Sequence, residues 1–238
     1  MTKTLVLGDI HGNLPALEAI IEHAEAEVAG WERAVCTGDI VGILGWPKEC
    51  IDVVASLCDE AVFGNHDARV RGDFAYAPSH RAANDEHRVV TEALDEEEVR
   101  WLRELPERVV TDEYILAHSR PKYQRDPGYP VHGFAKGDYG VPPGDVTRIG
   151  PHIDGKVALL GHTHRQHGVS VDKFPGQSGA VVNPGAAGAP WYDKAQYAIV
   201  DTEAQTWDFY DVEYDTGRVK LRLEDQGTPP RDYNNGRL

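Results

Sequence analysis

Four short apolar runs in this sequence each end in a glycine that is followed by a residue able to bind a metal ion. The four pairs are Gly8-Asp9, Gly38-Asp39, Gly64-Asn65 and Gly161-His162. Apolar runs of this length, bounded by turn residues, are typical of buried β-strands. Glycine removes side-chain bulk where a strand becomes a loop, so that the polar residues after it can crowd around a small centre. We therefore expect several strand ends to meet at one edge of a sheet.

Helical patterns separate the first three of these strands. Leu14 to Val28 repeats apolar residues at helical spacing, with Asn13 as the expected N-cap and Pro15 in the first turn. Pro47 to Leu57 predicts a second helix. The alternation of strand and helix indicates βαβ units, in which neighbouring parallel strands gather the loops at their carboxyl ends along one edge of the sheet.

The chain changes from helix to strand in its second half. Ala77 to Leu105 has a helical pattern, and we expect two helices with a break near Leu94, because the acidic residues Asp95 to Glu98 favour a helix N-terminus. Short β-rich runs follow, at Tyr114 to Ala117, Val157 to Leu160, Gly168 to Val171, Ala180 to Val182, Tyr197 to Val200 and Thr206 to Val212. We expect one domain over residues 1–224 and a polar tail over residues 225–238.

The composition is that of a folded protein that does not span a membrane. The 41% of apolar and 26% of charged residues are ordinary for a globular domain, and no stretch approaches the roughly 18 to 20 apolar residues of a spanning helix. The apolar run from Leu5 to Leu7 is too short for a signal peptide. Cys36, Cys50 and Cys58 are an odd set without C-x-x-C spacing, which argues against disulfides. We expect a cytoplasmic protein.

The net charge is strongly negative. The chain has 39 acidic residues against 24 Lys and Arg, a formal charge of −15, so its surface should repel nucleic acid and anionic lipid. We therefore expect neither long nucleic acid nor a membrane as a partner, while the number of subunits stays open. The acidic surplus suits either an ordinary cytoplasmic protein or a halophilic one, since the Debye length falls to about 3 Å at 1 M salt and self-repulsion is then screened.

Five segments in all place metal-ligand residue types beside apolar runs. They are Gly-Asp-Ile-His-Gly with Asp9 and His11, Gly-Asp-Ile-Val-Gly with Asp39, Gly-Asn-His-Asp with Asn65, Leu-Ala-His-Ser with His118, and Gly-His-Thr-His with His162 and His164. Alternate residues of an extended segment point to one side, so each ligand-x-ligand motif offers two side chains to one centre. Asp and Asn also cap helices, but caps require no imidazoles at these spacings. Carboxylate, imidazole and amide ligands together suit divalent Mn, Fe, Co, Ni or Zn.

In this order and spacing, the five segments resemble the calcineurin-like metallophosphoesterase superfamily over about residues 4–201. The resemblance implies an α/β fold, a four-layer α/β/β/α sandwich of two β-sheets flanked by helices, with the metal site at the loop-bearing edge. It also implies two metal ions. The first would be held by residues matching Asp9, His11 and His164, the second by those matching Asn65, His118 and His162, with Asp39 bridging the two.

Two divalent ions would give such a site a hydrolytic chemistry. Held about 3.5 to 4 Å apart, they lower the pKa of a bridging water, which becomes the hydroxide for in-line attack on phosphorus, and they neutralise the phosphoryl oxygens. No nucleophile from the protein is then required. Ligand type does not select among the candidate metals, and we favour Mn over Fe, Co, Ni and Zn.

Other residues near the motifs are candidates for contacts with the substrate. His66 matches the family's histidine that contacts the substrate phosphate and assists the leaving group, and we expect Asp67 to set its orientation. Arg120 and Lys122 form a positive cluster after the fourth motif and are candidate phosphate-binding residues, although ion pairing within a solvated loop explains them equally well. Pro121 to Gly155, rich in Gly, Pro and Tyr, is expected to be a functional loop.

Within the superfamily, the chain resembles the small phosphodiesterase branch of bacteria and archaea. It lacks the Asp-Arg-Gly of the Ser/Thr protein phosphatases and carries Asn-Pro-Gly at Asn183 to Gly185. It departs from that branch at Ser119 to Pro121, where Gly-Ser-Pro is common, and at Trp191, where Arg is common. The expected function is metal-dependent hydrolysis of a small phosphoester, with phosphodiesters favoured. A non-catalytic scaffold that binds a protein partner, and a dinucleoside polyphosphate hydrolase or nuclease, are the alternatives.

Overall fold

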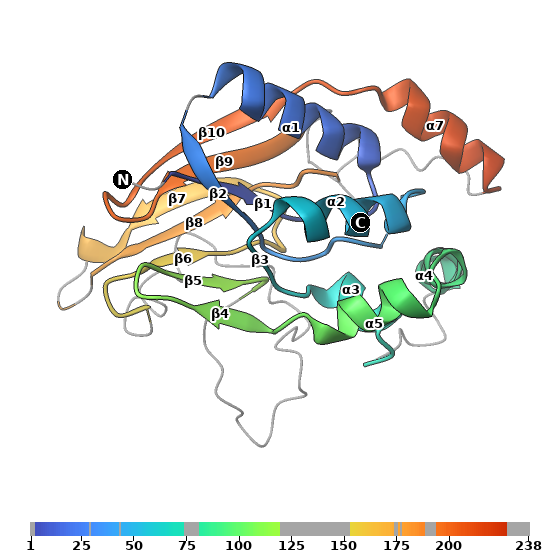
Figure 1. Ribbon diagram of the computed structural model, residues 1–238, viewed down its shortest axis with the longest axis horizontal. Helices are drawn as coiled ribbons and strands as arrows, with labels where there is room; N and C mark the ends of the chain where they lie inside the picture. The colour runs from blue at the N-terminus through green and yellow to red at the C-terminus, as the bar shows by residue number, and fades with distance from the viewer. Residues whose placement is uncertain are drawn as a thin grey trace.

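Two five-stranded β-sheets form the centre of the protein (Figure 1). The computed structural model describes residues 3–28, 30–42, 44–73, 81–119, 153–173, 176, 178–188 and 194–227. The first sheet has the strand order β10-β9-β1-β2-β3 and the second has the order β4-β5-β6-β8-β7. In sequence order the strands of the first sheet are β1 (Lys3–Leu7), β2 (Trp31–Cys36), β3 (Glu60–Ala61), β9 (Ala195–Asp201) and β10 (Thr206–Val212). Those of the second are β4 (Arg108–Val110), β5 (Tyr114–Ala117), β6 (Val157–Leu159), β7 (Gln166–Ser170) and β8 (Ala180–Pro184).

Both sheets have a parallel centre. In the first sheet β1 pairs in parallel with β2, and β2 with β3, while β9 and β10 complete the sheet in antiparallel pairing. In the second sheet β5, β6 and β8 are parallel, and β4 and β7 are antiparallel edge strands. The carboxyl ends of the central strands of each sheet therefore lie at one edge, as the βαβ pattern predicts.

Alternating side chains of the strands divide the interior into layers. On β1, Val6 faces the second sheet, whereas Leu5 and Leu7 face the helices. The same alternation on the other strands builds a core between the sheets from apolar side chains such as Leu116 and Leu159. The outer face of the second sheet carries a smaller cluster. Strands that are apolar on both faces are typical of sheets that are covered on both sides.

Helices flank the first sheet and gather at the loop-bearing edge (Figure 1). α1 (Leu14–Glu27) and α2 (Pro47–Leu57) pack their apolar faces on the first sheet. The N-cap of α1 is Asn13, as the sequence predicts, and its side-chain oxygen accepts a hydrogen bond from Ala16 N at 3.3 Å. The other helices of the described ranges are α3 (Asn65–Val70), α4 (Arg81–Ala93), α5 (Glu96–Glu104) and α7 (Thr216–Asp225), with a 3-10 turn η1 (Val171–Lys173).

The predicted α/β fold of two sheets flanked by helices is confirmed, and the differences lie at short or peripheral elements. The break near Leu94 is confirmed, because Asp95 caps α5 with a capping box. The run Glu60 to Phe63, which predicts a strand before Gly64, forms only the two-residue strand β3, which ends at Ala61. β4, α3 and α7 were not predicted. None of the helices in the described ranges is long and apolar enough to cross a membrane.

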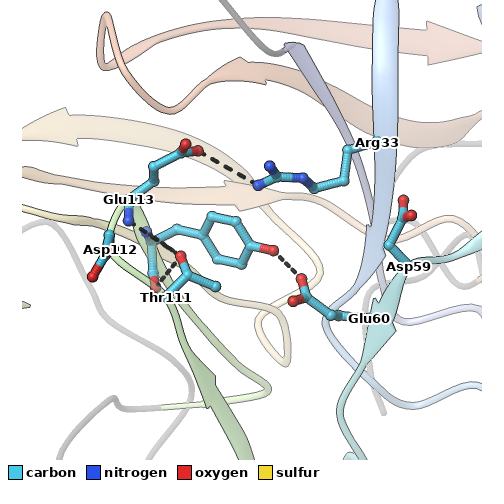
Figure 2. Close-up of a pocket in the computed structure, with 7 residues that line it drawn as sticks. Arg33, Asp59, Glu60, Thr111, Asp112 and Glu113 are labelled. Atoms are coloured by element: carbon cyan, nitrogen blue, oxygen red, sulfur yellow. Dashed lines mark hydrogen bonds and ion pairs between the residues drawn. The ribbon is translucent and has the colours of Figure 1, made fainter.

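A hollow of about 320 Å³ lies at the opposite edge, where β3 and β5 begin (Figure 2). Several of its polar side chains are already engaged in contacts between the two sheets or within the first one. Tyr114 donates to Glu60, and Arg33 pairs with Glu113 at 3.5 Å. The Asp59 carboxylate accepts from Ala34 N at 3.0 Å. The Tyr114–Glu60 and Arg33–Glu113 contacts join the sheets at the edge remote from the predicted ligands.

Candidate metal centre

All seven predicted metal ligands lie at the carboxyl edge, where the two sheets meet. They follow different strands: Asp9 and His11 follow β1, Asp39 follows β2, Asn65 opens α3 after β3, His118 follows β5, and His162 and His164 follow β6. The loops of the first sheet are tied to each other by backbone hydrogen bonds, including one from His11 N to the Asp39 carbonyl at 2.9 Å. The structure thus brings together residues that are as many as 155 positions apart in the sequence, from Asp9 to His164.

The backbone at these residues adopts an uncommon conformation. Seven non-glycine residues of the described chain have a positive φ, and five of them are predicted ligands: Asp9, His11, Asp39, His162 and His164. Such a conformation costs on the order of 1–3 kcal/mol per residue and tends to occur at functional sites. The neighbouring Gly161 has no room for a side chain, because a Cβ atom there would lie 2.6 Å from Thr37 Oγ1 and 2.9 Å from Asp9 Oδ2.

The first group of ligand atoms consists of Asp9, His11 and His164. The Nε2 atoms of His11 and His164 lie 3.1 Å apart, and His164 Nε2 lies 3.3 Å from Asp9 Oδ1. All three residues are buried, with Asp9 and His11 fully inaccessible. The backbone N–H of His162 donates to both oxygens of Asp9, at 2.9 and 3.1 Å, and so fixes the carboxylate.

The second group of ligand atoms consists of Asn65, His118 and His162. Asn65 Oδ1 lies 3.2 Å from His118 Nε2 and 2.9 Å from His162 Nδ1. The other ring nitrogen of His118 donates to the Thr37 carbonyl at 2.9 Å, because a carbonyl only accepts. That bond leaves Nε2 facing the site, which is how a partner outside the ligand set commonly orients a metal-binding histidine.

Asp39 lies between the two groups. Its Oδ2 atom is 3.8 Å from His11 Nε2 and 3.3 Å from His118 Nε2, so that one carboxylate oxygen faces ligands of both groups. Its Oδ1 atom accepts from the backbone N–H of His66 at 2.7 Å. Asp39 is 1% exposed. This placement is what a bridging carboxylate requires.

The spacing of the donor atoms fits divalent ions. Two ligand atoms that are each about 2.1 Å from one ion lie about 3.0 to 3.4 Å apart at octahedral or tetrahedral angles. Four of the ligand-atom pairs within the two groups lie 2.9 to 3.3 Å apart, and a fifth, Asp9 Oδ1 with His11 Nε2, lies 3.9 Å apart. Three sets of His and Asp side chains in the described chain place their ligand atoms within 4.8 Å of one another, and all three belong to this site. The donor set contains no thiolate, which also suits the candidate metals.

Burial and neighbouring charges shift the pKa values of these groups in opposite directions. Burial lowers the pKa of His162 to about 4, and it lowers that of His11 well below the usual range. Burial also opposes a charge on His118, but the nearby Asp39 carboxylate outweighs it and raises the pKa of His118 to about 9. In the same way Asp9 raises the pKa of His164 against the effect of burial. The carboxylates therefore favour the protonated form of two of the four ligand imidazoles when no metal is bound.

Metal binding is expected to release protons and to strengthen as the pH rises. An ion binds the neutral ring, so it must displace the protons that Asp39 and Asp9 favour on His118 and His164. Release of the His118 proton should raise the apparent affinity by up to about tenfold per pH unit, as long as the pH is below about 9. Calorimetric titration with Mn²⁺ at two pH values, each in two buffers of different ionisation enthalpy, measures both quantities. Affinity independent of both pH and buffer would contradict these ligand roles.

His66 and Asp67 lie beside the ligand groups in different ways. The His66 ring packs edge-on against the His11 ring, with 4.7 Å between centroids, and burial lowers the pKa of His66 to about 4. No hydrogen bond joins Asp67 to this ring among those of the described residues. The Asp67 carboxylate instead accepts from the backbone N–H groups of Gly64, Ile40 and Val41, because it is buried beneath the loop after β2.

Some predicted residues lie outside the described ranges, and one functional side chain was missed. Arg120, Lys122 and Trp191 are outside, so their roles stay predictions. The missed residue is Asn183, whose side-chain amide donates to the Gly161 carbonyl at 2.7 Å and to Thr163 Oγ1 at 3.1 Å. It thereby holds the loop that carries His162 and His164. The Asn-Pro-Gly segment was the sequence signal that pointed to it.

Comparison with known proteins gives the same family along nearly the whole chain. The model of the calcineurin-like phosphoesterase superfamily domain matches residues 2–205. An uncharacterised protein of Methanocaldococcus jannaschii is 27% identical over 236 residues, which cover 94% of this chain and 93% of that protein. The crystal structure of a metallophosphoesterase from Sphaerobacter thermophilus superposes with a TM-score of 0.78 at 25% identity, covering 98% of this chain and 96% of that one. A protein of Pyrococcus horikoshii superposes with a TM-score of 0.77 at 24% identity over the same shares of the two chains. The chain therefore belongs to the calcineurin-like phosphoesterase superfamily.

Proposed function

We propose that this protein is a metal-dependent phosphoester hydrolase that acts on small phosphodiesters. It would use two divalent metal ions, with Mn²⁺ as the favoured metal. The observation that carries the proposal is the position of Asp39, one of whose oxygens faces ligand nitrogens of both groups at 3.8 and 3.3 Å. A single ion would need only one of the two ligand groups that lie on either side of this carboxylate. Asp9, His11 and His164 would hold one ion, and Asn65, His118 and His162 the other.

When bound, the ions would supply Lewis-acid chemistry that activates water and neutralises the phosphoryl oxygens. The chain's own residues would fix the geometry. The Thr37 carbonyl orients His118, the His162 N–H orients Asp9, and the His66 N–H orients Asp39. These contacts come from backbone groups beside strand ends and in the first turn of α3, so the ligands are already oriented before a reaction.

His66 would act on the substrate itself. Its ring belongs to the same cluster as His11 and Asp39, yet it is partly exposed where His11 is fully buried. With the pKa lowered to about 4 by burial, the ring is neutral at neutral pH and offers one N–H donor. A phosphoryl anion beside it would raise that pKa and favour proton donation to the leaving oxygen.

The alternatives differ in what they require of this site. A non-catalytic scaffold has no need of seven ligand side chains and His66 in one cluster. A nuclease that binds long nucleic acid needs a broad basic surface to match the phosphate backbone, which a formal charge of −15 does not favour. A dinucleoside polyphosphate hydrolase would use the same site on another small substrate, and only an assay separates it from a phosphodiesterase.

The test is metal reconstitution followed by a panel of substrates. The protein is stripped with a chelator, restored with Mn²⁺, Fe²⁺, Co²⁺, Ni²⁺ or Zn²⁺ in turn, and assayed with aryl phosphodiesters, aryl phosphomonoesters, cyclic nucleotides and dinucleoside polyphosphates. We expect no turnover in the stripped protein and the highest kcat/KM for a phosphodiester with Mn²⁺. Full activity without metal would contradict the proposal, and a preference for dinucleoside polyphosphates would favour the alternative substrate.

A further inference from the structure

The Asp67 carboxylate joins the loop after β2 to the start of α3. Oδ2 accepts from Gly64 N at 2.8 Å and from Ile40 N at 3.3 Å, and Oδ1 accepts from Val41 N at 3.0 Å. Asp67 is fully buried. One side chain therefore satisfies three backbone donors from two segments, and hydrogen bonds to a charged acceptor are among the stronger ones in proteins. Loss of this acceptor would leave buried N–H groups unpaired and free the loop to shift.

The loop that Asp67 holds leads directly to the His66 ring. Gly42, the residue after Val41, has φ of 151°, which favours glycine. A Cβ atom at Gly42 would lie 2.6 Å from His66 Nδ1 and 2.8 Å from His66 Cγ. The backbone of residue 42 thus packs against the imidazole, with no space for a side chain between them.

Two further contacts place His66 within this arrangement. The His11 ring meets the His66 ring edge-on, with an interplanar angle of 86°. The backbone N–H of His66 donates to Asp39. The ring is therefore held between Gly42 and His11, and a shift of the Gly42 backbone would change where the His66 nitrogens point.

We propose that Asp67 is a positioning residue for His66 that acts through the backbone of residues 40–42, with Gly42 as the surface on which the imidazole rests. The catalytic effect of the ring's orientation rests on the proposed function, whereas the orientation of the ring itself does not. Asp67 thus orients the His66 ring without a direct contact between the two side chains. It also explains why the chain has glycine at position 42.

The first arm of the test observes the ring. The wild-type protein, Asp67→Asn and Gly42→Ala are labelled with ¹⁵N-histidine and titrated with Zn²⁺, which is diamagnetic, and His66→Ala assigns the His66 ring signals. We expect the His66 ring shifts to move in both variants while most other histidine signals stay in place. Gly30→Ala is the matched control, because Gly30 also has a positive φ, of 83°, but a Cβ atom there would meet no other atom within 4 Å. Unchanged His66 signals in both variants would overturn the proposal, whatever the activity.

The second arm is a double-mutant cycle on kcat. Asp67→Asn and Gly42→Ala should each lower kcat by on the order of 10- to 100-fold with little change in KM, as expected for a misplaced catalytic group. On the His66→Ala background the same changes should cost almost nothing further, because their effect passes through a ring that is gone. Additive losses would show that Asp67 acts on the metal ligands instead and would overturn the proposal. If the wild type turns over no substrate, the proposed function fails and the ring signals alone decide this inference.

Discussion

Replacing Asp39 with Asn is expected to remove metal binding and hydrolysis together. The carboxylate faces His11 and His118 with Oδ2 and the His66 N–H with Oδ1, so both of its oxygens are in use. An amide keeps one oxygen and turns an NH₂ group toward the other set of partners. It also lacks the negative charge that a pair of divalent ions requires between them. Neither orientation of Asn restores the wild-type arrangement.

The expected loss in kcat/KM for Asp39→Asn is at least about 10³-fold. A bound ion stabilises the transition state by several kcal/mol, and about 4 kcal/mol corresponds to about 10³ in rate. The variant should still fold, because loss of Asp39 removes the largest cause that raises the pKa of His118, so that this buried ring gives up its proton more readily. Metal content by mass spectrometry and the rate with an aryl phosphodiester measure both effects. Asp208→Asn, an exposed change of the same kind on β10, is the control. A variant with full metal content would contradict a bridging role.

Replacing His66 with Ala is expected to separate chemistry from metal binding. His66 lies against His11 and its backbone N–H fixes Asp39, but alanine keeps that N–H. Both ions should therefore remain bound. Loss of a general acid typically costs about 10²- to 10⁴-fold in rate, and we expect this loss in kcat with little change in KM.

The control for His66→Ala is His23→Ala. His23 lies on α1 and bonds the Tyr197 hydroxyl at 2.9 Å, apart from the ligand groups. It should keep both metal content and kcat. Wild-type kcat in His66→Ala would contradict a catalytic role for His66. Loss of metal in His66→Ala would show that His66 is needed for metal binding.

The sequence predicts the ligands because local rules determine where strands end. A glycine followed by Asp, Asn or His after an apolar run marks the transition from strand to loop, and parallel pairing of β1, β2 and β3 places three such transitions side by side. How the two sheets pack on each other is not determined by the local sequence. That Asp39 lies 3.3 Å from His118 Nε2 depends on the packing of one sheet on the other and becomes visible only in the structure.

The elements that the sequence did not predict are held by contacts across long distances in the chain. α7 docks on the loop before α2, where Arg222 and Gln226 donate to the Gly45 carbonyl at 3.0 and 3.2 Å and Arg218 lies over the Trp46 ring. Its own sequence is too polar and too short to indicate a stable helix, since such helices depend on tertiary packing. β4 has three residues and, among the described strands, pairs with β5 alone. Strands of this length carry too little pattern to be recognised.

The role of Asp67 shows the same limit at the site. Its place beside His66 in the sequence suggested that it orients the ring, but not through which atoms: its carboxylate turns toward the N–H groups of Ile40 and Val41 on another loop. Adjacent residues at the start of a helix point in different directions, so proximity in sequence does not predict which side chains touch. The hydrogen bonds of the Asp67 carboxylate become visible only in the structure.

The most direct test of the metal centre is anomalous diffraction from crystals soaked in Mn²⁺. We predict two anomalous peaks about 3.5 to 4 Å apart, on either side of the Asp39 carboxylate, one beside His11 and His164 and the other beside Asn65 and His118. A single peak would contradict the bridging role of Asp39. The absence of any peak among these side chains, in a protein that is otherwise folded as described, would contradict the metal centre itself.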